Sequence, residues 1–285
     1  MRPHVELINQ ADYIWHPAEF VGHEGRAWQR NLSVDEETGS ASLRVDFETD
    51  WGRPEGYHHA DNEWYVLSGS VRIGNETLGP HGYFRAPKGV LTPTIRVAPG
   101  TEILLYREYG DWGFDAAISN RPGTPIDHVI TVLHTAEIEW TPVITQGPAP
   151  GLYIKMLHRD PETGFYSRLI WAKPGWTDHR LAHHPVFEEA YTIAGSMVYN
   201  YGPLTPGTYF FRPARVKHGH FISNEPDGCT WFIRSDGDLI NWYTTNARVV
   251  ATGDAENYDP ETEGPVIAGI PVRSTSVGEW DGDGR

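Results

Sequence analysis

Two similar stretches decide how this chain is organised: WGRPEGYHHADNE at residues 51–63 and WTDHRLAHHPVFE at residues 176–188. Each begins with tryptophan, carries a His-His pair seven residues later and ends on glutamate. The two stretches are offset by 125 residues. A pattern of this length in one register indicates that the chain contains a duplicated domain.

Further identities extend the duplication on both sides of these stretches. At the same offset they are Trp15 with Trp140, Pro17 with Pro142, Asp35 with Asp160, and Glu37-Thr38-Gly39 with Glu162-Thr163-Gly164. Beyond Glu63 the offset grows by one residue, and Gly69-Ser70 matches Gly195-Ser196. We therefore predict two domains, at residues 1–124 and 125–285, with the boundary in the turn-rich stretch 120–125 and a polar tail at the C-terminal end.

The runs between turn residues are short and typical of strands. In the first copy they are residues 42–47, 63–67, 70–73, 94–97 and 102–106, and in the second copy 167–171, 190–193, 208–211 and 230–233. The chain's 30 glycines and 22 prolines are spread between such runs. This spacing predicts an all-β protein built as sandwiches or barrels.

The overall composition excludes several classes of protein. A formal net charge of −15 argues against a nucleic-acid-binding surface and against docking to anionic membranes. Cys229 is the only cysteine, which excludes a disulfide framework and a cysteine zinc site. The sequence has no apolar run of membrane-spanning length and no N-terminal signal pattern. We expect a cytoplasmic protein.

Potential metal ligands cluster in the second copy. His179, His183, His184, Glu188 and Glu189 lie within eleven residues, and His218 and His220 follow about thirty residues later. Imidazole and carboxylate together suit a divalent transition metal. Because residues two apart on a strand share a face, His218 and His220 are expected to point the same way.

These residues resemble the two motifs of the cupin family. The first motif reads Gly-x5-His-x-His-x4-Glu-x6-Gly, and its places are occupied here by Gly175, Leu181, His183, Glu188 and Gly195. The second reads Gly-x5-Pro-x-Gly-x2-His-x3-Asn, with Gly207, Pro213, Arg215, His218 and Ile222 in those places. The resemblance implies a bicupin of two tandem jelly-roll β-barrels, with one divalent metal inside each intact barrel.

Leu181 replaces one usual ligand, which leaves three ligand sets open in the second copy. His183, Glu188 and His218 could bind the metal alone, or His179 could supply a fourth ligand. His184 could replace His183 if the turn shifts by one residue, although the motif register ranks His183 first.

The first copy keeps His58, His59 and Glu63 but has Thr92 and Thr94 in place of His218 and His220. We favour a structural role for this copy. The alternative is a weaker metal site completed by water or by His81.

The preferred function is that of a metal-dependent dioxygenase acting on a small chelating substrate such as a hydroxy-ketone, diketone or phenol. Fe²⁺ is favoured, and Mn²⁺, Ni²⁺, Cu²⁺ or Zn²⁺ would also suit the ligands. Glu189 or His220 could accept the proton. The alternatives are a redox-neutral isomerase or lyase and a non-catalytic binding protein.

Two expectations concern binding partners. Arg168, Arg212 and Arg215 lie near the motifs and could clamp a substrate carboxylate, or could pair with the chain's many acidic residues. The resemblance also allows a homodimer, since cupins commonly associate through exposed strands or exchanged termini.

Overall fold

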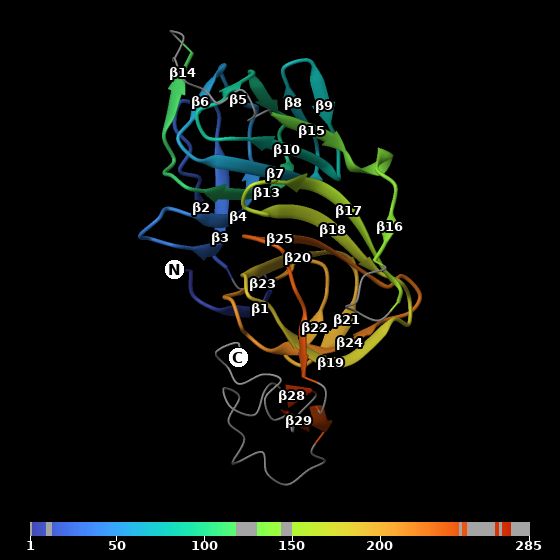
Figure 1. The fold of residues 1–285 in the computed structure, drawn as a ribbon. Coiled ribbons are helices and arrows are strands. Elements are labelled where there is room, and N and C mark those ends of the chain that lie inside the picture. The colour runs from blue at the N-terminus through green and yellow to red at the C-terminus, as the bar shows by residue number, and fades with distance from the viewer. Residues whose placement is uncertain are drawn as a thin grey trace. The chain divides into compact units, whose positions relative to one another are not determined.

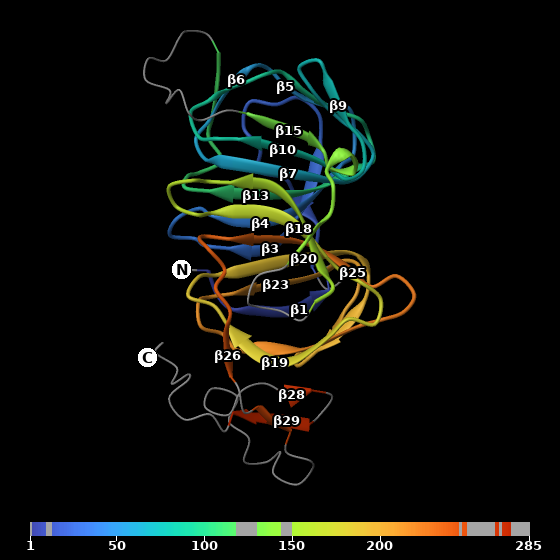
Figure 2. The ribbon, with the colours of Figure 1, turned by 45° about the vertical axis from the view of Figure 1, so that its right-hand side comes forward.

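The chain folds into two units made almost entirely of β-strands (Figures 1 and 2). The computed structural model describes residues 2–9, 13–117, 130–143, 150–244, 247–249, 266–267 and 270–274. Unit 1 comprises Met1–Pro3 and Gln10–Glu139, and unit 2 comprises His4–Asn9 and Trp140–Arg285. The boundary predicted between residues 124 and 125 lies outside the described residues, and the chain divides between Glu139 and Trp140.

The main sheet of unit 1 has seven antiparallel strands. In spatial order they are β15 (Thr131–His134), β10 (Gly82–Ala86), β7 (Asp61–Ser68), β13 (Thr101–Glu108), β4 (Ala41–Phe47), β3 (Ala27–Val34) and β2 (His16–Pro17). Two smaller sheets accompany it: β5 (Trp51–Arg53), β12 (Ile95–Val97), β8 (Val71–Ile73) and β9 (Glu76–Leu78), and β11 (Leu91–Thr92), β6 (Gly56–His58) and β14 (Phe114–Ala116). A 3₁₀ turn, η2 (Thr135–Glu137), follows β15.

The main sheet of unit 2 also has seven antiparallel strands. They are β1 (Val5–Asn9), β23 (Thr208–Arg212), β20 (Glu188–Gly195), β25 (Cys229–Ser235), β18 (Tyr166–Ala172), β17 (Leu152–Arg159) and β16 (Thr141–Pro142). The second sheet contains β22 (Gly202–Leu204), β21 (Met197–Tyr199), β24 (His218–Ser223), β19 (Thr177–His183) and β26 (Trp242–Thr244). A small C-terminal sheet holds β27 (Ala247–Val249), β29 (Ile270–Ser274) and β28 (Val266–Ile267).

The two main sheets repeat one strand order, which is the structural form of the sequence duplication. From β10 to β2 and from β23 to β16, equivalent strands occupy equivalent places. The nine strand-like runs predicted from the sequence all coincide with strands, and their ends agree to within two residues. Each sheet is completed at one edge by a strand that precedes the other copy in the chain: β15 in unit 1 and β1 in unit 2.

The repeated Asp-x-Glu-Thr-Gly segment forms the same turn in both units. Asp35 and Asp160 each accept hydrogen bonds at Oδ1 from the two backbone amides that lie two and three residues later, at 2.8–3.4 Å. The turn closes on Gly39 or Gly164, with φ of 74° and 76°. This left-handed conformation favours glycine, which explains why the residue is present in both copies.

The two cores are filled differently. In unit 1, aromatic rings pack together between the sheets, with Phe20 and Phe47 at 5.0 and 5.3 Å from the Trp51 ring and Trp64 at 6.0 Å. In unit 2, Trp176 occupies the repeat position of Trp51, and a cavity of about 170 Å³ opens beside it. No helix in the described residues has the length and apolar character required to cross a membrane.

Candidate metal centre

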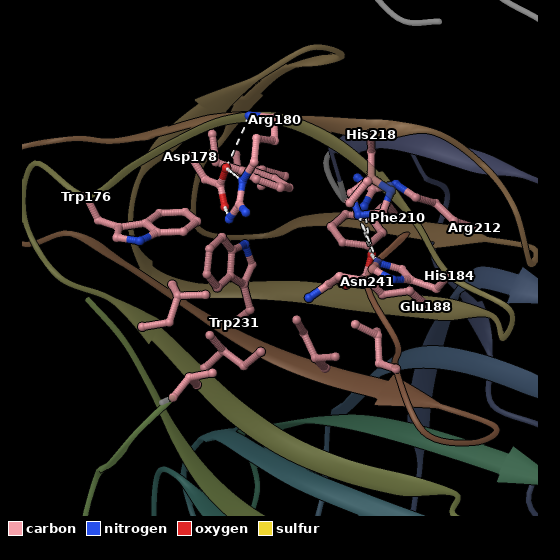
Figure 3. A pocket seen from close by; sticks show the side chains of 18 of the residues that line it. Trp176, Asp178, Arg180, His184, Glu188, Phe210, Arg212, His218, Trp231 and Asn241 are labelled. Carbon is pink, nitrogen blue, oxygen red and sulfur yellow. Dashed lines mark hydrogen bonds and ion pairs between the residues drawn. The ribbon is translucent and has the colours of Figure 1, made fainter. Parts of the chain in front are cut away.

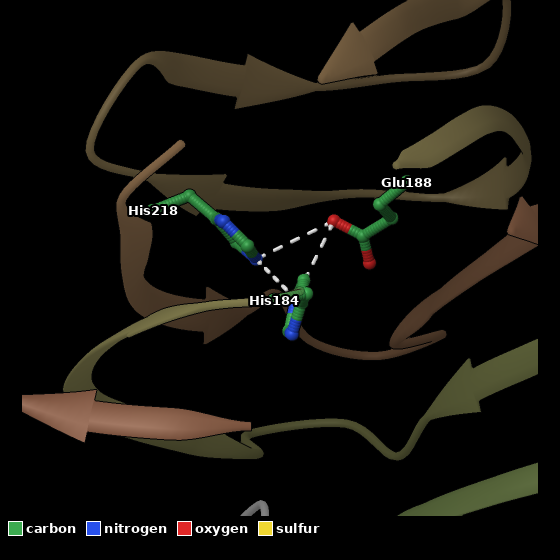
Figure 4. Close-up of side chains that lie close together, drawn as sticks. All are labelled: His184, Glu188 and His218. Atoms are coloured by element: carbon green, nitrogen blue, oxygen red, sulfur yellow. Dashed lines mark hydrogen bonds and ion pairs between the residues drawn. The ribbon is translucent and has the colours of Figure 1, made fainter. Parts of the chain in front are cut away.

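Three side chains in unit 2 bring ligand atoms to one point (Figure 4). His184 follows the end of β19, Glu188 begins β20 and His218 begins β24. The Nε2 atoms of the two histidines are 3.1 Å apart, and Glu188 Oε2 lies 3.4 Å from His218 Nε2 and 3.9 Å from His184 Nε2. All three residues are buried. We call these residues the triad.

The backbone determines which nitrogen of each ring faces the centre. His184 Nδ1 lies 3.2 Å from the Ile240 carbonyl oxygen, and His218 Nδ1 lies 3.1 Å from that of Val216. A carbonyl only accepts, so each Nδ1 carries the proton and each Nε2 presents a lone pair. Burial lowers the pKa of both histidines, which keeps both rings neutral at pH 7. Hydrogen bonds of this kind orient the histidine ligands of metal sites.

The triad fits a divalent metal. Two lone pairs and a carboxylate oxygen converge without a proton between them, an arrangement that a cation would stabilise. Two nitrogen ligands about 2.1 Å from one metal and at about a right angle would lie about 3.0 Å apart, close to the 3.1 Å between the two Nε2 atoms. Two histidines and one carboxylate on one side of a metal leave its other positions open.

Arg212 on β23 holds the carboxylate of the triad in place. Its Nη1 donates to Glu188 Oε2 at 2.8 Å, and its Nε donates to Glu6 Oε1 at 2.5 Å. Glu6 lies on β1 and also accepts a hydrogen bond from the Tyr199 hydroxyl. The first strand of the chain is therefore connected to the metal centre through a single buried guanidinium.

Glu6 is expected to make the stability of unit 2 depend on pH. Burial opposes ionisation of this carboxyl, but Arg212 and the hydrogen-bond donors outweigh burial and lower its pKa from 4.5 to about 2. The ion pair therefore contributes fully above about pH 4.5, on the order of 3 kcal/mol, and this contribution is lost as the pH falls towards 2. Urea unfolding should show wild type more stable than Glu6→Gln at pH 7, with the gap closing at low pH. A gap that is constant with pH would contradict this assignment.

The triad forms one end of the cavity in unit 2 (Figure 3). The indoles of Trp176 and Trp231 lie at the other end, and apolar side chains from both sheets line the walls between them. Arg180 and Asp178 line the cavity as a bidentate pair, with N–O distances of 2.9 and 2.8 Å. The cavity is therefore largely apolar with a few fixed polar groups, as in small-molecule sites.

The structure brings together His184, and not His183 or His179, with Glu188 and His218. The cavity is lined by alternate residues of this segment: Trp176, Asp178, Arg180, Ala182 and His184. His183 lies on the other face with its ring 5.1 Å from that of Trp242, and His179 is exposed. In the cupin motif, the two histidine positions of this segment fall on Leu181 and His183. Because side chains alternate along a strand, these two positions lie on the face opposite to the one that lines the cavity.

An irregularity in strand pairing accompanies this difference in register. Between the pairs Asp178–Phe221 and Leu181–Gly219, β19 has one residue more than β24. Alternate residues of β19 still line the cavity on both sides of this irregularity, whereas the two cavity-lining residues of β24, His218 and Phe221, are three positions apart. The irregularity therefore changes which side chains of β24 face inwards, and motif spacing alone cannot place it.

The two proposed proton acceptors do not line the cavity. Glu189 is buried on the other face of β20, where Arg234 pairs with Oε1 and the Tyr209 hydroxyl donates to Oε2 at 2.8 Å. His220 does not share the orientation of His218, because Gly219 and His220 have φ of 155° and 54° and interrupt the extended backbone. Burial and the charge of nearby His179 lower the pKa of His220 to about 4.

The equivalent residues of unit 1 are not gathered at one point. His58 is buried beside Arg53, and His59 lies between Asp111 and Asp115 at 3.3 and 3.2 Å. Burial and Arg53 lower the pKa of His58 to about 3. Glu63 pairs with Arg85 at 3.7 Å.

The other first-copy candidates also have different neighbours. The His81 ring nitrogen lies 2.9 Å from the Tyr65 hydroxyl, and the Thr92 hydroxyl donates to the Val90 carbonyl. Among the described residues, the triad in unit 2 is the single group of three potential ligand atoms that lie together.

Sequence reasoning did not identify Glu6, Trp231 or Asn241 as parts of the site. Side chains alternate along β25, and Ile233 faces inwards. Trp231, two residues earlier, could therefore have been expected to face inwards as well. Extending the repeat to residues 5–8 and 130–133 could have revealed β1, the strand that carries Glu6.

Comparison with known proteins gives one family match and several similar folds. The model of a family described as "Domain of unknown function (DUF4437)" matches residues 6–242. A presumed dioxygenase from Nostoc punctiforme is 21% identical, with a TM-score of 0.71 and 84% of each chain covered. No curated protein sequence matches the chain.

Two further structures have the same type of fold at lower similarity. A single-residue variant of Bacillus subtilis oxalate decarboxylase is 16% identical, with a TM-score of 0.54, and 83% of this chain and 78% of that chain are covered. The YlbA protein of E. coli is 18% identical, with a TM-score of 0.57 and coverage of 81% and 89%. These likenesses confirm the predicted all-β, jelly-roll cupin fold.

Proposed function

The chain belongs to the DUF4437 family, and from the geometry of its second unit we propose that it is a metal-dependent bicupin enzyme, a dioxygenase acting on a small chelating substrate. The observation that carries the proposal is the convergence of two imidazole lone pairs and a carboxylate oxygen at one end of a mostly apolar cavity. The equal strand order of the two main sheets supports the bicupin assignment. The ring-filled interior of unit 1 supports a structural role for the first copy.

The residues of the triad have separate tasks in this proposal. His184, Glu188 and His218 would hold the metal, with Fe²⁺ favoured. The bound metal would supply open positions for a chelating substrate and O₂. Ile240 and Val216 keep the imidazoles in the tautomer that can bind metal, and Arg212 orients the carboxylate. The apolar walls exclude water from the reacting groups.

The cavity also limits the size of the substrate. A protein cavity of about 150 Å³ lined by apolar side chains holds benzene. The cavity in unit 2, at about 170 Å³, therefore suits a phenol, hydroxy-ketone or diketone of single-ring size.

The reaction class can be tested by oxygen consumption. Freshly purified protein should contain about one divalent metal per chain by elemental analysis, and chelation should abolish turnover. Small phenols, hydroxy-ketones and diketones should be screened with an oxygen electrode, and we expect O₂ uptake to match substrate loss. Equal turnover under strict anaerobiosis would instead support a metal-dependent isomerase or lyase.

A further inference from the structure

Among the described residues that line the cavity of unit 2, one arginine has no carboxylate partner. Of the three arginines that were candidate carboxylate clamps, Arg215 is exposed and Arg212 is paired with Glu6 and Glu188. Arg168 lines the cavity and has no carboxylate within 4.0 Å among the described residues. Its Nε is buried and has no hydrogen-bond acceptor in the described part of the chain, and its guanidinium lies 4.3 Å from the centre of the Tyr166 ring.

The overall charge of the cavity also favours an anion. The guanidinium groups of Arg168, Arg180 and Arg212 are balanced by the carboxylates of Asp178, Glu188 and Glu6. A divalent metal at the triad would then leave two positive charges in a mostly apolar space. Buried charges of one sign are costly unless a partner neutralises them.

The sheet sets the distance between Arg168 and the triad. Arg168 on β18 pairs with Ile233 on β25, and Ile233 pairs with Ala190 on β20, two residues from Glu188. Arg168 is therefore two strands away from the strand that carries Glu188, or about 10 Å at ordinary strand spacing. An acid of single-ring size could reach both groups, given the length of the arginine side chain.

We propose that Arg168 binds a carboxylate of the substrate, so that the enzyme acts on a single-ring-sized carboxylic acid whose other oxygens face the triad. A guanidinium is suited to this role because its planar donors match a carboxylate. Trp231 Nε1 is a second buried donor in the cavity without a partner among the described residues, and it would donate to another oxygen of the acid. The substrate class deepens the proposed function and rests on it.

The proposal can be tested by comparing a carboxylate probe with its neutral amide. Salicylate and salicylamide have the same ring and hydroxyl, and each should be titrated into metal-loaded protein by calorimetry. We expect wild type to prefer salicylate. Arg168→Met should weaken salicylate at least about tenfold, the loss expected for a charge-assisted hydrogen bond, and leave salicylamide unchanged. Arg168→Lys should retain part of the preference.

The control variant is Arg215→Met, which removes an exposed arginine and should change neither affinity. Metal content, measured for every variant, distinguishes the two proposals: a wild-type protein without metal would contradict the proposed function, not the role of Arg168. Three results would each overturn the assignment of Arg168. Wild type could bind salicylate and salicylamide with equal affinity, Arg168→Met could weaken both probes equally, or salicylate could fail to bind at millimolar concentration.

Discussion

Replacing His184 with alanine should remove the metal from the second unit, whereas replacing His183 should leave it bound. His184 Nε2 is one of three ligand atoms that converge, and His183 lies on the opposite face of the strand beside Trp242. Loss of a group that only orients a ligand typically weakens metal binding 10- to 100-fold. Loss of the ligand itself should therefore cost about 100-fold or more.

The measurement is metal stoichiometry after dialysis, followed by competition with a chelator of known affinity. His218→Ala should behave like His184→Ala, while Thr92→Ala in unit 1 should leave total metal nearly unchanged. His179→Ala is a control on β19, the strand that carries His183, because His179 is exposed and absent from the triad. If His183→Ala loses metal and His184→Ala retains it, the cupin motif register is correct and the triad is misassigned.

Replacing Arg212 with methionine should destabilise unit 2 by about 3–5 kcal/mol in metal-free protein. The guanidinium is almost fully buried and pairs with both Glu6 and Glu188. Methionine would fill much of the volume but would leave Glu188 buried and Glu6 partly buried without the guanidinium, and breaking a buried pair in this way costs about that amount. The unfolding transition of unit 2 should be measured in urea at pH 7.

A second substitution distinguishes the loss of charge pairing from the loss of packing. Adding Glu6→Gln to Arg212→Met removes one of the stranded charges and should recover part of the stability. Arg159→Met is the surface control, because its pair with Asp238 is exposed and should contribute no more than about 1 kcal/mol. A loss below about 1 kcal/mol for Arg212→Met would show that the buried carboxylates find other partners or become protonated.

The amino-acid sequence by itself determined the duplication, the fold class and the positions of nine strands, which include the central strands of both main sheets. Alternating apolar residues and repeated turn residues act locally, so runs such as residues 42–47 and 167–171 could be assigned to strands without a structure. The Asp-x-Glu-Thr-Gly repeat is local in the same way, because an aspartate side chain binds backbone amides two and three residues later. The chemical types of the ligands also followed from the sequence.

The tertiary structure alone decided which neighbouring residues face the cavity. His183 and His184 are adjacent, and a shift of one residue exchanges the faces of a strand. The choice between them depends on the pairing of β19 with β24, whose residues lie about forty positions apart. Glu188 and Glu189 differ for the same reason: the first faces the triad, and the second is held by Arg234 and Tyr209.

Pairing between distant segments also brought Glu6 to the site. It determined, in addition, which charged side chains of the cavity have partners. β1 joins the sheet of unit 2 through pairs such as Val5 with Phe211, although the residues that follow it in the chain belong to unit 1. No local pattern specifies such a partner, because a strand edge offers the same hydrogen-bonding groups to any extended segment. The same long-range packing pairs Arg212 with two carboxylates and, among the described residues, places none within 4.0 Å of Arg168. Three similar arginines in a sequence do not reveal this distinction.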